Sequence, residues 1–332
     1  MARVVRFHEV GPPEVLQIED IEIGEPGPGE IRLRVQAIGL NRAEVNFRSG
    51  HYLEQAKLPA RLGYEAAGIV EAAGEGVTGW RNGDAVCVIP AFSLNDYGVY
   101  AERAIVPASA VVARPPGLGT VEAAAVWMPN LTAYGALIDV CAIGRGDAVV
   151  ITAASSSVGL AAIQLANHRG AVSIAVTRTE AKRAGLRQAG AAHVVVTGSQ
   201  DLTAEVMRIT GGAGACLVFD PVSGPGIVGL VGALAHRGML LLYGNLSEKA
   251  EQTPFPFVQS VTKGFSVRGY SLREILRDPG RRAKAQAFIL EGLASGALKP
   301  RIDRTFPFGQ IVAAHRYLEA NAQMGKIVVT VS

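Results

Sequence analysis

The chain has 332 residues, of which 49% are hydrophobic and 18% charged, and its formal net charge is +3. This length predicts two domains, and the balance of apolar and charged residues excludes a disordered protein. Lysines and arginines are scattered, so we expect no nucleic-acid partner, and no apolar run approaches the ~20 residues that a membrane span needs. The N-terminus lacks the apolar stretch of a signal peptide, which favours a cytoplasmic protein.

The three cysteines, Cys87, Cys141 and Cys216, lie far apart in the sequence. Their odd number and wide spacing exclude a disulfide framework and a cysteine-rich zinc motif. Each lies in apolar sequence, so we expect three buried, inert thiols.

The first ~120 residues are typical of a β domain, because short runs rich in Val and Ile alternate with Gly and Pro turns. We expect an irregular, barrel-like domain. Its predicted strands are residues 4–7, 31–37, 66–72, 85–89 and 100–106.

From Thr120 onward the pattern changes to helices and then to apolar strands that alternate with helices. Thr120 is expected to cap a helix over residues 121–126, and a second helix is expected over 132–140. Apolar strands separated by helices indicate a parallel sheet covered on both faces, which is the doubly wound nucleotide-binding fold. The predicted strands are residues 148–152, 173–176, 193–196, 215–219 and 239–243, and the predicted helices are 158–167, 180–189, 202–209 and 226–235.

The tail combines a possible last sheet strand over 265–270 with a helix over 281–294. Strands over 302–306 and 326–331, with a helix over 308–321 between them, complete it. We expect most of this tail to return to the first domain. The predicted division is therefore 1–121, 122–266 and 267–332.

One strand-to-helix junction, residues 149–159, has the features of a phosphate-binding loop. Small residues there let the backbone approach a pyrophosphate, and the helix N-terminus offers unpaired N–H groups. The candidate ligand residues are Ser155, Ser156, Ser157 and Val158. Only Gly159 remains of the usual glycines, so an ordinary turn with a serine N-cap is the alternative.

The end of the following strand suggests which dinucleotide would bind. An NAD site has an acidic residue near this point, whereas this chain has Thr177, Arg178 and Thr179, followed by Lys182. Hydroxyl groups and a guanidinium suit a 2′-phosphate, so the residues favour NADPH over NADH. The alternative for Arg178 is an exposed loop charge.

Several segments together resemble the medium-chain dehydrogenase/reductase superfamily, specifically its quinone oxidoreductase-like branch. The resemblance covers essentially the whole chain, and the order and spacing of its segments make it specific. They are Gly39-Leu40-Asn41, Arg48 to Tyr52, Gly63 to Val70, Gly83 to Val86, Gly98 to Glu102, Leu131 to Tyr134, Gly146 to Val150, Phe219 to Val222 and Gly325 to Val328.

The resemblance implies an α/β fold in which a GroES-like β-barrel catalytic domain is interrupted by a Rossmann nucleotide-binding domain. It also implies a substrate cleft between the domains and a homodimer or homotetramer. Zinc-dependent alcohol dehydrogenases of the superfamily carry Cys and His ligands where this chain has Asn41 and Tyr64. An amide and a phenol replace thiolate and imidazole poorly, so we expect no metal. Glu65 is then expected to have a structural or supporting role.

Without zinc, polarising a simple alcohol or carbonyl is hard, so we expect an acceptor already activated by conjugation, such as a quinone or an α,β-unsaturated carbonyl. The resemblance implies that Tyr52 helps to protonate the product, although this ring could instead shape the pocket. It implies that Asn41 binds cofactor or substrate, and that Tyr64 lines the pocket where a metal would otherwise lie. Asn46 stands where quinone reductases often carry Tyr, which departs from a strict quinone pattern.

The remaining candidate residues also follow from the resemblance and from position in the sheet. Thr132 matches a threonine near the nicotinamide amide, with a helix cap as the alternative. Tyr243, Gly244 and Asn245 follow a strand at the edge where ligands bind in such folds. Lys326 resembles a residue near the cofactor, with an exposed lysine at the start of a strand as the alternative.

Three functions are consistent with these observations. The first is an NADPH-dependent reductase of quinones or enones. The second is an enoyl-thioester reductase, whose carrier would need a basic patch that Arg42, Arg48 and Arg61 could supply. The third is a regulatory or interaction protein that binds NADPH with little catalysis.

Overall fold

The computed structural model describes residues 1–331, and their contacts divide the chain into two compact units. Unit 1 comprises Met1–Met128 and the chain from Pro300 onward, and unit 2 comprises Pro129–Lys299. The helix α3 (Trp127–Tyr134) therefore begins in unit 1 and continues in unit 2.

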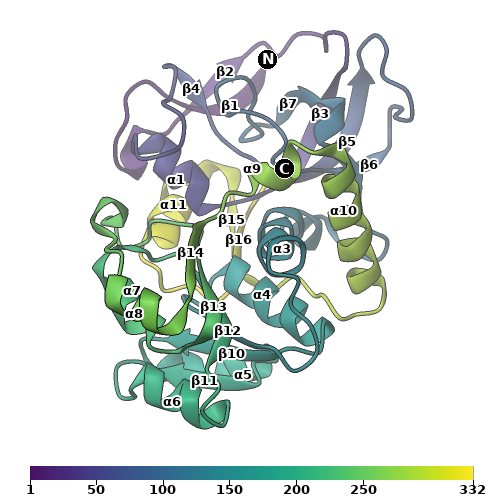
Figure 1. Ribbon diagram of the computed structural model, residues 1–332. Coiled ribbons are helices and arrows are strands. Elements are labelled where there is room, and N and C mark those ends of the chain that lie inside the picture. The colour runs from purple at the N-terminus through teal and green to yellow at the C-terminus, as the bar shows by residue number, and fades with distance from the viewer. Residues whose placement is uncertain (332) are drawn as a thin grey trace. The chain divides into compact units, whose positions relative to one another are not determined.

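Unit 1 consists mainly of two sheets. The larger has the strand order β15-β16-β3-β5-β6-β8, with β7 also paired to β3, and the smaller has the order β2-β1-β4. The yellow C-terminal strands lie beside β3 from the start of the chain, because β16 pairs antiparallel with its carboxyl end (Figure 1). The strands are β1 (Ala2–Phe7), β2 (Gln17–Ile21), β3 (Glu30–Gly39), β4 (Ala60–Arg61), β5 (Ala66–Ala73), β6 (Ala85–Val88), β7 (Arg103–Pro107), β8 (Val111–Ala113), β15 (Ile302–Pro307) and β16 (Lys326–Thr330). The helices are α1 (Arg42–Arg48), α2 (Thr120–Ala123) and α11 (Ile311–Glu319).

Unit 2 contains one parallel sheet with the strand order β11-β10-β9-β12-β13-β14. Numbered within the unit this order is 3-2-1-4-5-6, which is that of the Rossmann fold. The strands are β9 (Ala148–Ile151), β10 (Val172–Thr177), β11 (His193–Val196), β12 (Ala215–Asp220), β13 (Leu234–Leu242) and β14 (Ser266–Gly269). The helices α4 (Ser157–His168), α5 (Arg183–Gln188), α6 (Leu202–Ile209), α7 (Ile227–Val231) and α8 (Phe257–Lys263) pack along the sheet (Figure 1). The helices α9 (Arg273–Leu276) and α10 (Pro279–Ala294) follow its last strand, and a π-helical segment (Gly135–Val140) continues α3.

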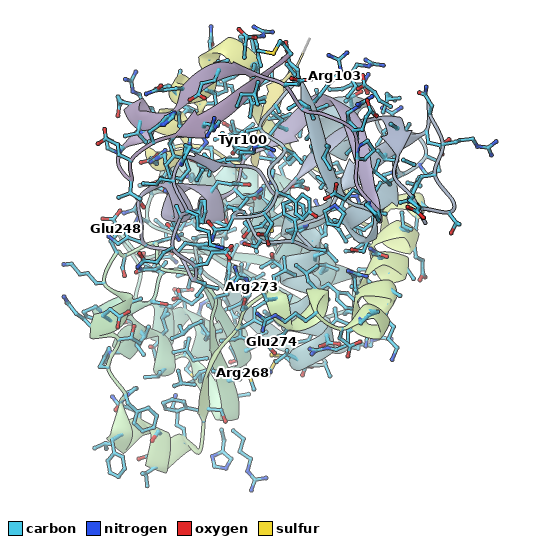
Figure 2. The ribbon with its side chains drawn as sticks, turned by 90° about the horizontal axis from the view of Figure 1, so that it is seen from above. Tyr100, Arg103, Glu248, Arg268, Arg273 and Glu274 are labelled. Carbon is cyan, nitrogen blue, oxygen red and sulfur yellow. The ribbon has the colours of Figure 1, made fainter. Side chains whose placement is uncertain are left out.

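The core of unit 2 explains why its central strands are rich in apolar residues. Val150, Ile174 and Val218 from three neighbouring strands are fully buried and pack with residues of α6 and α7. At the sheet edge, the Arg268 guanidinium on β14 binds the Glu274 carboxylate on α9 at 2.7 Å (Figure 2). The predicted fold class, a β-rich GroES-like unit with a Rossmann unit, is confirmed.

Several predicted boundaries differ from the structure. The tail between residues 267 and 299 lies in unit 2, because β14 extends its sheet and Lys299 exchanges two backbone hydrogen bonds with the Gln164 side chain on α4. The helix predicted over 226–235 ends at Val231, because Leu234 already pairs with Ala215 in the sheet. Thr120 is the first residue of α2 and Gly119 is its N-cap.

The prediction of three buried thiols is confirmed for Cys87 and wrong for Cys141 and Cys216, which are partly exposed. Burial nevertheless raises the pKa of all three thiols, to about 11 for Cys141 and about 12 for the other two. Such thiols are weak nucleophiles at neutral pH.

A buried arginine connects the two ends of the chain within unit 1. Arg48, at the end of α1, donates to the Gly11 carbonyl, to Nδ1 of His315 and to the Glu319 carboxylate. His315 lies on α11 and its ring packs edge-on against Tyr100, which is labelled in Figure 2. Burial, together with the nearby guanidinium, lowers the pKa of His315 to about 3.

This imidazole predicts an acid-dependent loss of stability. The folded-state pKa lies below the unfolded value of 6.5, so the unfolded chain takes up the proton first as pH falls. The stabilisation is full above pH 6.5 and decreases between 6.5 and about 3, by about 1.4 kcal/mol per pH unit. The variant His315→Gln keeps a hydrogen-bond acceptor for Arg48 and should remove this pH-dependent component. Between about pH 6.5 and about pH 5, we expect the free energy of unfolding of wild type to fall by about 2 kcal/mol more than that of the variant.

Urea unfolding of both proteins at these pH values measures the difference. The variant His51→Gln, at an exposed histidine of the same unit, controls for loss of an ordinary imidazole. Equal pH dependence in wild type and His315→Gln would contradict the neutral, buried assignment.

Candidate functional site

The predicted phosphate-binding loop lies between β9 and α4. The Ser156 hydroxyl caps α4 by accepting from the Gly159 N–H at 3.0 Å. The serine N-cap that was considered as the alternative is therefore present in this loop. Ser155, Ser157 and Val158 flank the cap and are partly exposed. A cap satisfies one N–H of the first turn and leaves others for an anion.

Gly159 is required by the close approach of the loop backbone. A Cβ atom at this position would lie 2.6 Å from the Ala154 carbonyl oxygen and 2.7 Å from its Cα. Any side chain would therefore push the loop away from the helix, which explains why this one glycine remains.

A hydrogen bond marks the point where the strand order of the sheet reverses. The Thr152 hydroxyl, directly after β9, donates to the Asp220 carboxylate at the end of β12 at 2.5 Å. The same carboxylate accepts from the backbone N–H groups of Val222 and Ser223, and burial raises the pKa of Asp220. Ligands of open α/β sheets bind in the crevice at this position. Sequence reasoning did not select Asp220, although its position at a strand end was a usable signal.

A positive charge lies beside the loop. The Lys182 ammonium donates to the Ser155 hydroxyl at 2.9 Å, which places a cation at the predicted phosphate site. Thr177 is buried at the end of β10, and its carbonyl accepts from the Thr197 backbone and hydroxyl groups. Arg178, the next residue, is exposed.

The other predicted cofactor residues of unit 2 have mainly internal contacts. Tyr243 stacks on Phe219 with ring centroids 4.0 Å apart, and the Gly244 carbonyl accepts from the Ser223 hydroxyl. The Asn245 side chain accepts from Ala250 N–H, which orders its own loop. Thr132 is buried inside α3, so the alternative of a helix cap is wrong.

The central feature of unit 1 is a buried ammonium. Lys326 is 1% exposed, so the alternative of an exposed lysine is wrong. Its Nζ donates to Asn41 Oδ1 at 2.5 Å and to Glu65 Oε2 at 2.6 Å. Its stem passes Gly39, where a Cβ would lie 2.7 Å from Lys326 Cε and 2.0 Å from the Ala124 carbonyl oxygen.

Glu65 uses its second oxygen to hold the beginning of α3. Oε1 accepts from the backbone N–H groups of Trp127 at 2.6 Å and Met128 at 3.1 Å. Burial raises the pKa of Glu65, while the Lys326 ammonium and these two donors oppose that rise. The expected supporting role of Glu65 therefore has a structural basis: its carboxylate, directly before β5, caps the N-terminus of α3.

A second buried carboxylate, Glu44, orients the Asn41 side chain. It accepts from the Asn41 backbone at 2.5 Å, from Asn41 Nδ2 at 3.1 Å and from the Tyr64 backbone at 3.0 Å. Burial raises the pKa of Glu44 to about 7. Sequence reasoning missed this residue, but the spacing Asn41-x-x-Glu44 is that of a capping box.

The two tyrosines of the predicted site are neighbours. The rings of Tyr52 and Tyr64 lie 6.3 Å apart between centroids, and Tyr64 also contacts Phe92 at 5.7 Å. Tyr64 is buried, whereas Tyr52 and Phe92 are partly exposed. The Glu44 and Glu65 carboxylates thus bring Asn41, Tyr64 and Lys326 together, and the functional roles of these residues stay predictions.

The residues at the positions of the zinc ligands do not fit a metal ion. Asn41 Oδ1 and Glu65 Oε2 already bind the Lys326 ammonium, and a second cation there would meet direct electrostatic repulsion. Among residues 1–331, no group of three or more His, Cys, Asp and Glu side chains could hold a metal. We derive no chemistry through zinc.

Comparisons with known proteins agree with this architecture. Residues 27–116 match the alcohol dehydrogenase GroES-like domain, and residues 157–288 match the family described as zinc-binding dehydrogenase. The chain is 32% identical to a quinone oxidoreductase of Pseudomonas aeruginosa, over 99% of both chains. It is 30% identical to a 2-haloacrylate reductase of a Burkholderia species, over 99% of this chain and 98% of that one.

A solved structure has the same fold over the whole length. The Escherichia coli quinone oxidoreductase complexed with NADPH superposes with a TM-score of 0.91 at 29% identity, over 99% of this chain and all of that one. The fold and the loop define a two-unit oxidoreductase with a Rossmann unit. The chain belongs to the medium-chain dehydrogenase/reductase superfamily, in its quinone oxidoreductase-like branch.

The buried pair predicts a strong dependence of stability on Lys326. Lys326→Met leaves Glu65 buried without its cation, so we expect the free energy of unfolding to fall by about 3–5 kcal/mol. The double variant Lys326→Met with Glu65→Gln is expected to recover at least about 1 kcal/mol of this loss, because the two residues interact directly.

Denaturant unfolding gives the free energies of unfolding of wild type, the two single variants and the double variant, which together form a double-mutant cycle. Lys57→Met, at an exposed lysine of the same unit, is the matched control. A loss for Lys326→Met no greater than for Lys57→Met would contradict the buried pair.

Proposed function

We propose that this protein is a zinc-independent, NADPH-dependent oxidoreductase that transfers a hydride to a quinone or an α,β-unsaturated carbonyl. The observation that carries the proposal is the buried Lys326 ammonium, which binds Asn41, at the position of one zinc ligand in zinc-dependent relatives, and Glu65, next to the position of another. Because the ammonium occupies the Asn41 and Glu65 oxygen atoms, these atoms hold no metal ion that could polarise the substrate. A substrate that is already activated by conjugation is therefore favoured.

The residues of unit 2 fit a phosphorylated dinucleotide. The capped α4 N-terminus and the Lys182 ammonium suit a pyrophosphate, and Arg178 is accessible for a 2′-phosphate. The NADPH complex of the Escherichia coli relative supports the same cofactor. When bound, NADPH supplies the hydride, and the protein must orient the acceptor and provide a proton.

The proposed roles in unit 1 follow from the contacts. Tyr52 is the proposed proton donor to the acceptor oxygen, because its ring is partly exposed beside Tyr64. Asn41 is held in one orientation by Glu44 and Lys326, so it can offer a fixed contact to cofactor or acceptor. Lys326 is proposed to act through Asn41 and Glu65.

The structure weakens the argument for an enoyl-thioester reductase, which relied on a basic patch. Arg48 is buried among Gly11, His315 and Glu319, so it cannot bind the phosphates of a carrier. Arg42 is engaged by the Leu318 carbonyl and Asn321. The Burkholderia relative adds unsaturated acids to the acceptors that an assay must include.

The homodimer and the cytoplasmic location remain predictions. No helix among residues 1–331 is long and apolar enough to cross a membrane. Light scattering on the purified protein measures the oligomeric state.

The first experiment follows NADPH oxidation by absorbance, with NADH in parallel, against quinones, enones, enals, an unsaturated acid and an enoyl thioester. We expect turnover with NADPH and a quinone or enone, and no change when a metal chelator is added. Loss of activity with the chelator would contradict zinc independence. Binding of NADPH, seen as quenched fluorescence, with no acceptor reduced would favour the regulatory role.

The choice of cofactor is tested at Arg178. Arg178→Ala is expected to raise the KM for NADPH by roughly tenfold or more, because a charged hydrogen bond to the 2′-phosphate is lost. The KM for NADH should change little. Arg208→Ala, at an exposed arginine on α6 whose guanidinium binds the Glu205 carboxylate, is the control. A wild-type preference for NADH would contradict the assignment of Arg178.

A further inference from the structure

A row of aromatic rings crosses unit 1 and ends at its partly exposed side. Ring centroids are separated by 6.0 Å from Phe7 to Phe47 and by 6.2 Å from Phe47 to Tyr52. The row continues through Tyr64 to Phe92. Tyr52 and Phe92 are partly exposed, and Tyr64 between them is buried. The rings of Tyr52 and Phe92 are tilted against Tyr64, by 56° and 38°, and their exposed parts offer an apolar aromatic surface of the kind that a conjugated molecule can contact.

The Glu54 carboxylate lies beside these aromatic rings. Glu54 accepts from the Tyr64 hydroxyl at 3.4 Å, from the Ser93 hydroxyl at 2.8 Å and from the Leu94 N–H at 3.4 Å. An ionised carboxylate can only accept hydrogen bonds, and all three of these partners are donors. Glu54 is partly exposed, so its charge faces both the tyrosine hydroxyl and the solvent side of the surface.

The surrounding contacts fix the position of this charge. Asn95 accepts from the Lys57 N–H at 2.8 Å and donates to the Gln55 carbonyl at 2.9 Å. These bonds join the loop that carries Glu54 to the loop that carries Ser93 and Phe92. The Glu54 side chain is itself bound to the second loop through Ser93 and Leu94, so a rotation away from Tyr64 would break these contacts.

We propose that Glu54 is a specificity-determining residue that makes the site select uncharged planar acceptors and reject acceptors bearing a carboxylate or sulfonate. The inference rests on the proposed function, since it assumes that the acceptor lies against Tyr52 and Tyr64. A neutral quinone buries its rings on the aromatic surface and meets no opposing charge. An anionic acceptor brings a permanent negative charge toward Glu54, and like charges brought together at a binding site reduce affinity strongly.

The test uses matched pairs of acceptors that differ mainly in charge: 1,4-naphthoquinone with its 2-sulfonate, and methyl 2-chloroacrylate with 2-chloroacrylate. We expect wild type to favour the neutral member of each pair by about tenfold or more in kcat/KM, and we expect added salt to narrow the difference. Glu54→Gln keeps an oxygen acceptor and removes the charge. It should reduce the preference by about tenfold, mainly through a lower KM for the anionic member.

Two further variants separate charge from structure. Ser93→Ala removes a hydrogen bond to Glu54 and keeps the charge, so it should keep the preference. Glu75→Gln removes an exposed charge elsewhere in the same unit and should also leave it unchanged. Equilibrium binding of the same acceptor pairs to the protein, without NADPH, gives a readout that does not depend on turnover.

The outcomes distinguish the two proposals. Reduction of the anionic acceptors as efficiently as the neutral ones, or an unchanged preference in Glu54→Gln, would overturn the role of Glu54 while the reductase activity stands. Reduction of no acceptor by wild type would overturn the proposed function. In that case, equal binding of charged and neutral members would overturn the inference as well.

Discussion

The buried ammonium of Lys326 is the interaction on which the organisation of unit 1 depends. Lys326 starts β16, near the end of the chain, while its partners Asn41 and Glu65 lie 285 and 261 residues earlier. Glu65 in turn holds the first N–H groups of α3. A carboxylate buried this deeply is costly without a cation, so unit 1 is complete only when the C-terminal segment has returned to β3. The pair therefore ties the C-terminal segment to the first part of the chain, on the two sides of unit 2 in the sequence.

Periodic patterns in the sequence were sufficient to predict the sheet of unit 2. Its central strands β9 and β12 are buried on both faces, so the apolar runs at Ala148–Ile151 and Ala215–Asp220 were visible without knowledge of their neighbours. The start of β13 could not be predicted in the same way. Leu234 follows a helix and a glycine, and only its pairing with Ala215 makes it part of a strand. The border at Lys299 likewise depends on the Gln164 side chain, which is 135 residues away.

The candidate site also contains residues that local sequence could predict and residues that only distant contacts determine. The phosphate loop, Lys182 and Arg178 belong to one continuous strand-helix-strand unit, so their proximity follows from local sequence. Arg48 was a candidate for a basic patch because sequence shows its charge but not its burial, which is produced by Gly11 and by the distant His315 and Glu319. Lys326 was placed near the cofactor by resemblance. Its pairing with Glu65 could not be inferred, since nothing in the local pattern Gly325-Lys326-Ile327 distinguishes a buried lysine from an exposed one.

The distribution of charge connects the two halves of the proposed reaction. In unit 2 the cations Lys182 and Arg178 suit the phosphates of a dinucleotide. In unit 1 the Lys326 cation is already engaged by Glu65, and the Glu54 carboxylate lies beside the Tyr64 hydroxyl. A negative charge that develops on the acceptor after hydride addition would therefore be stabilised by hydrogen-bond donors and by prompt protonation, and not by a metal. Such a site is suited to acceptors whose anions are already delocalised, as in a hydroquinone or an enolate. The proposed NADPH of unit 2 and the proposed neutral, conjugated acceptor of unit 1 thus both follow from the charges of these side chains.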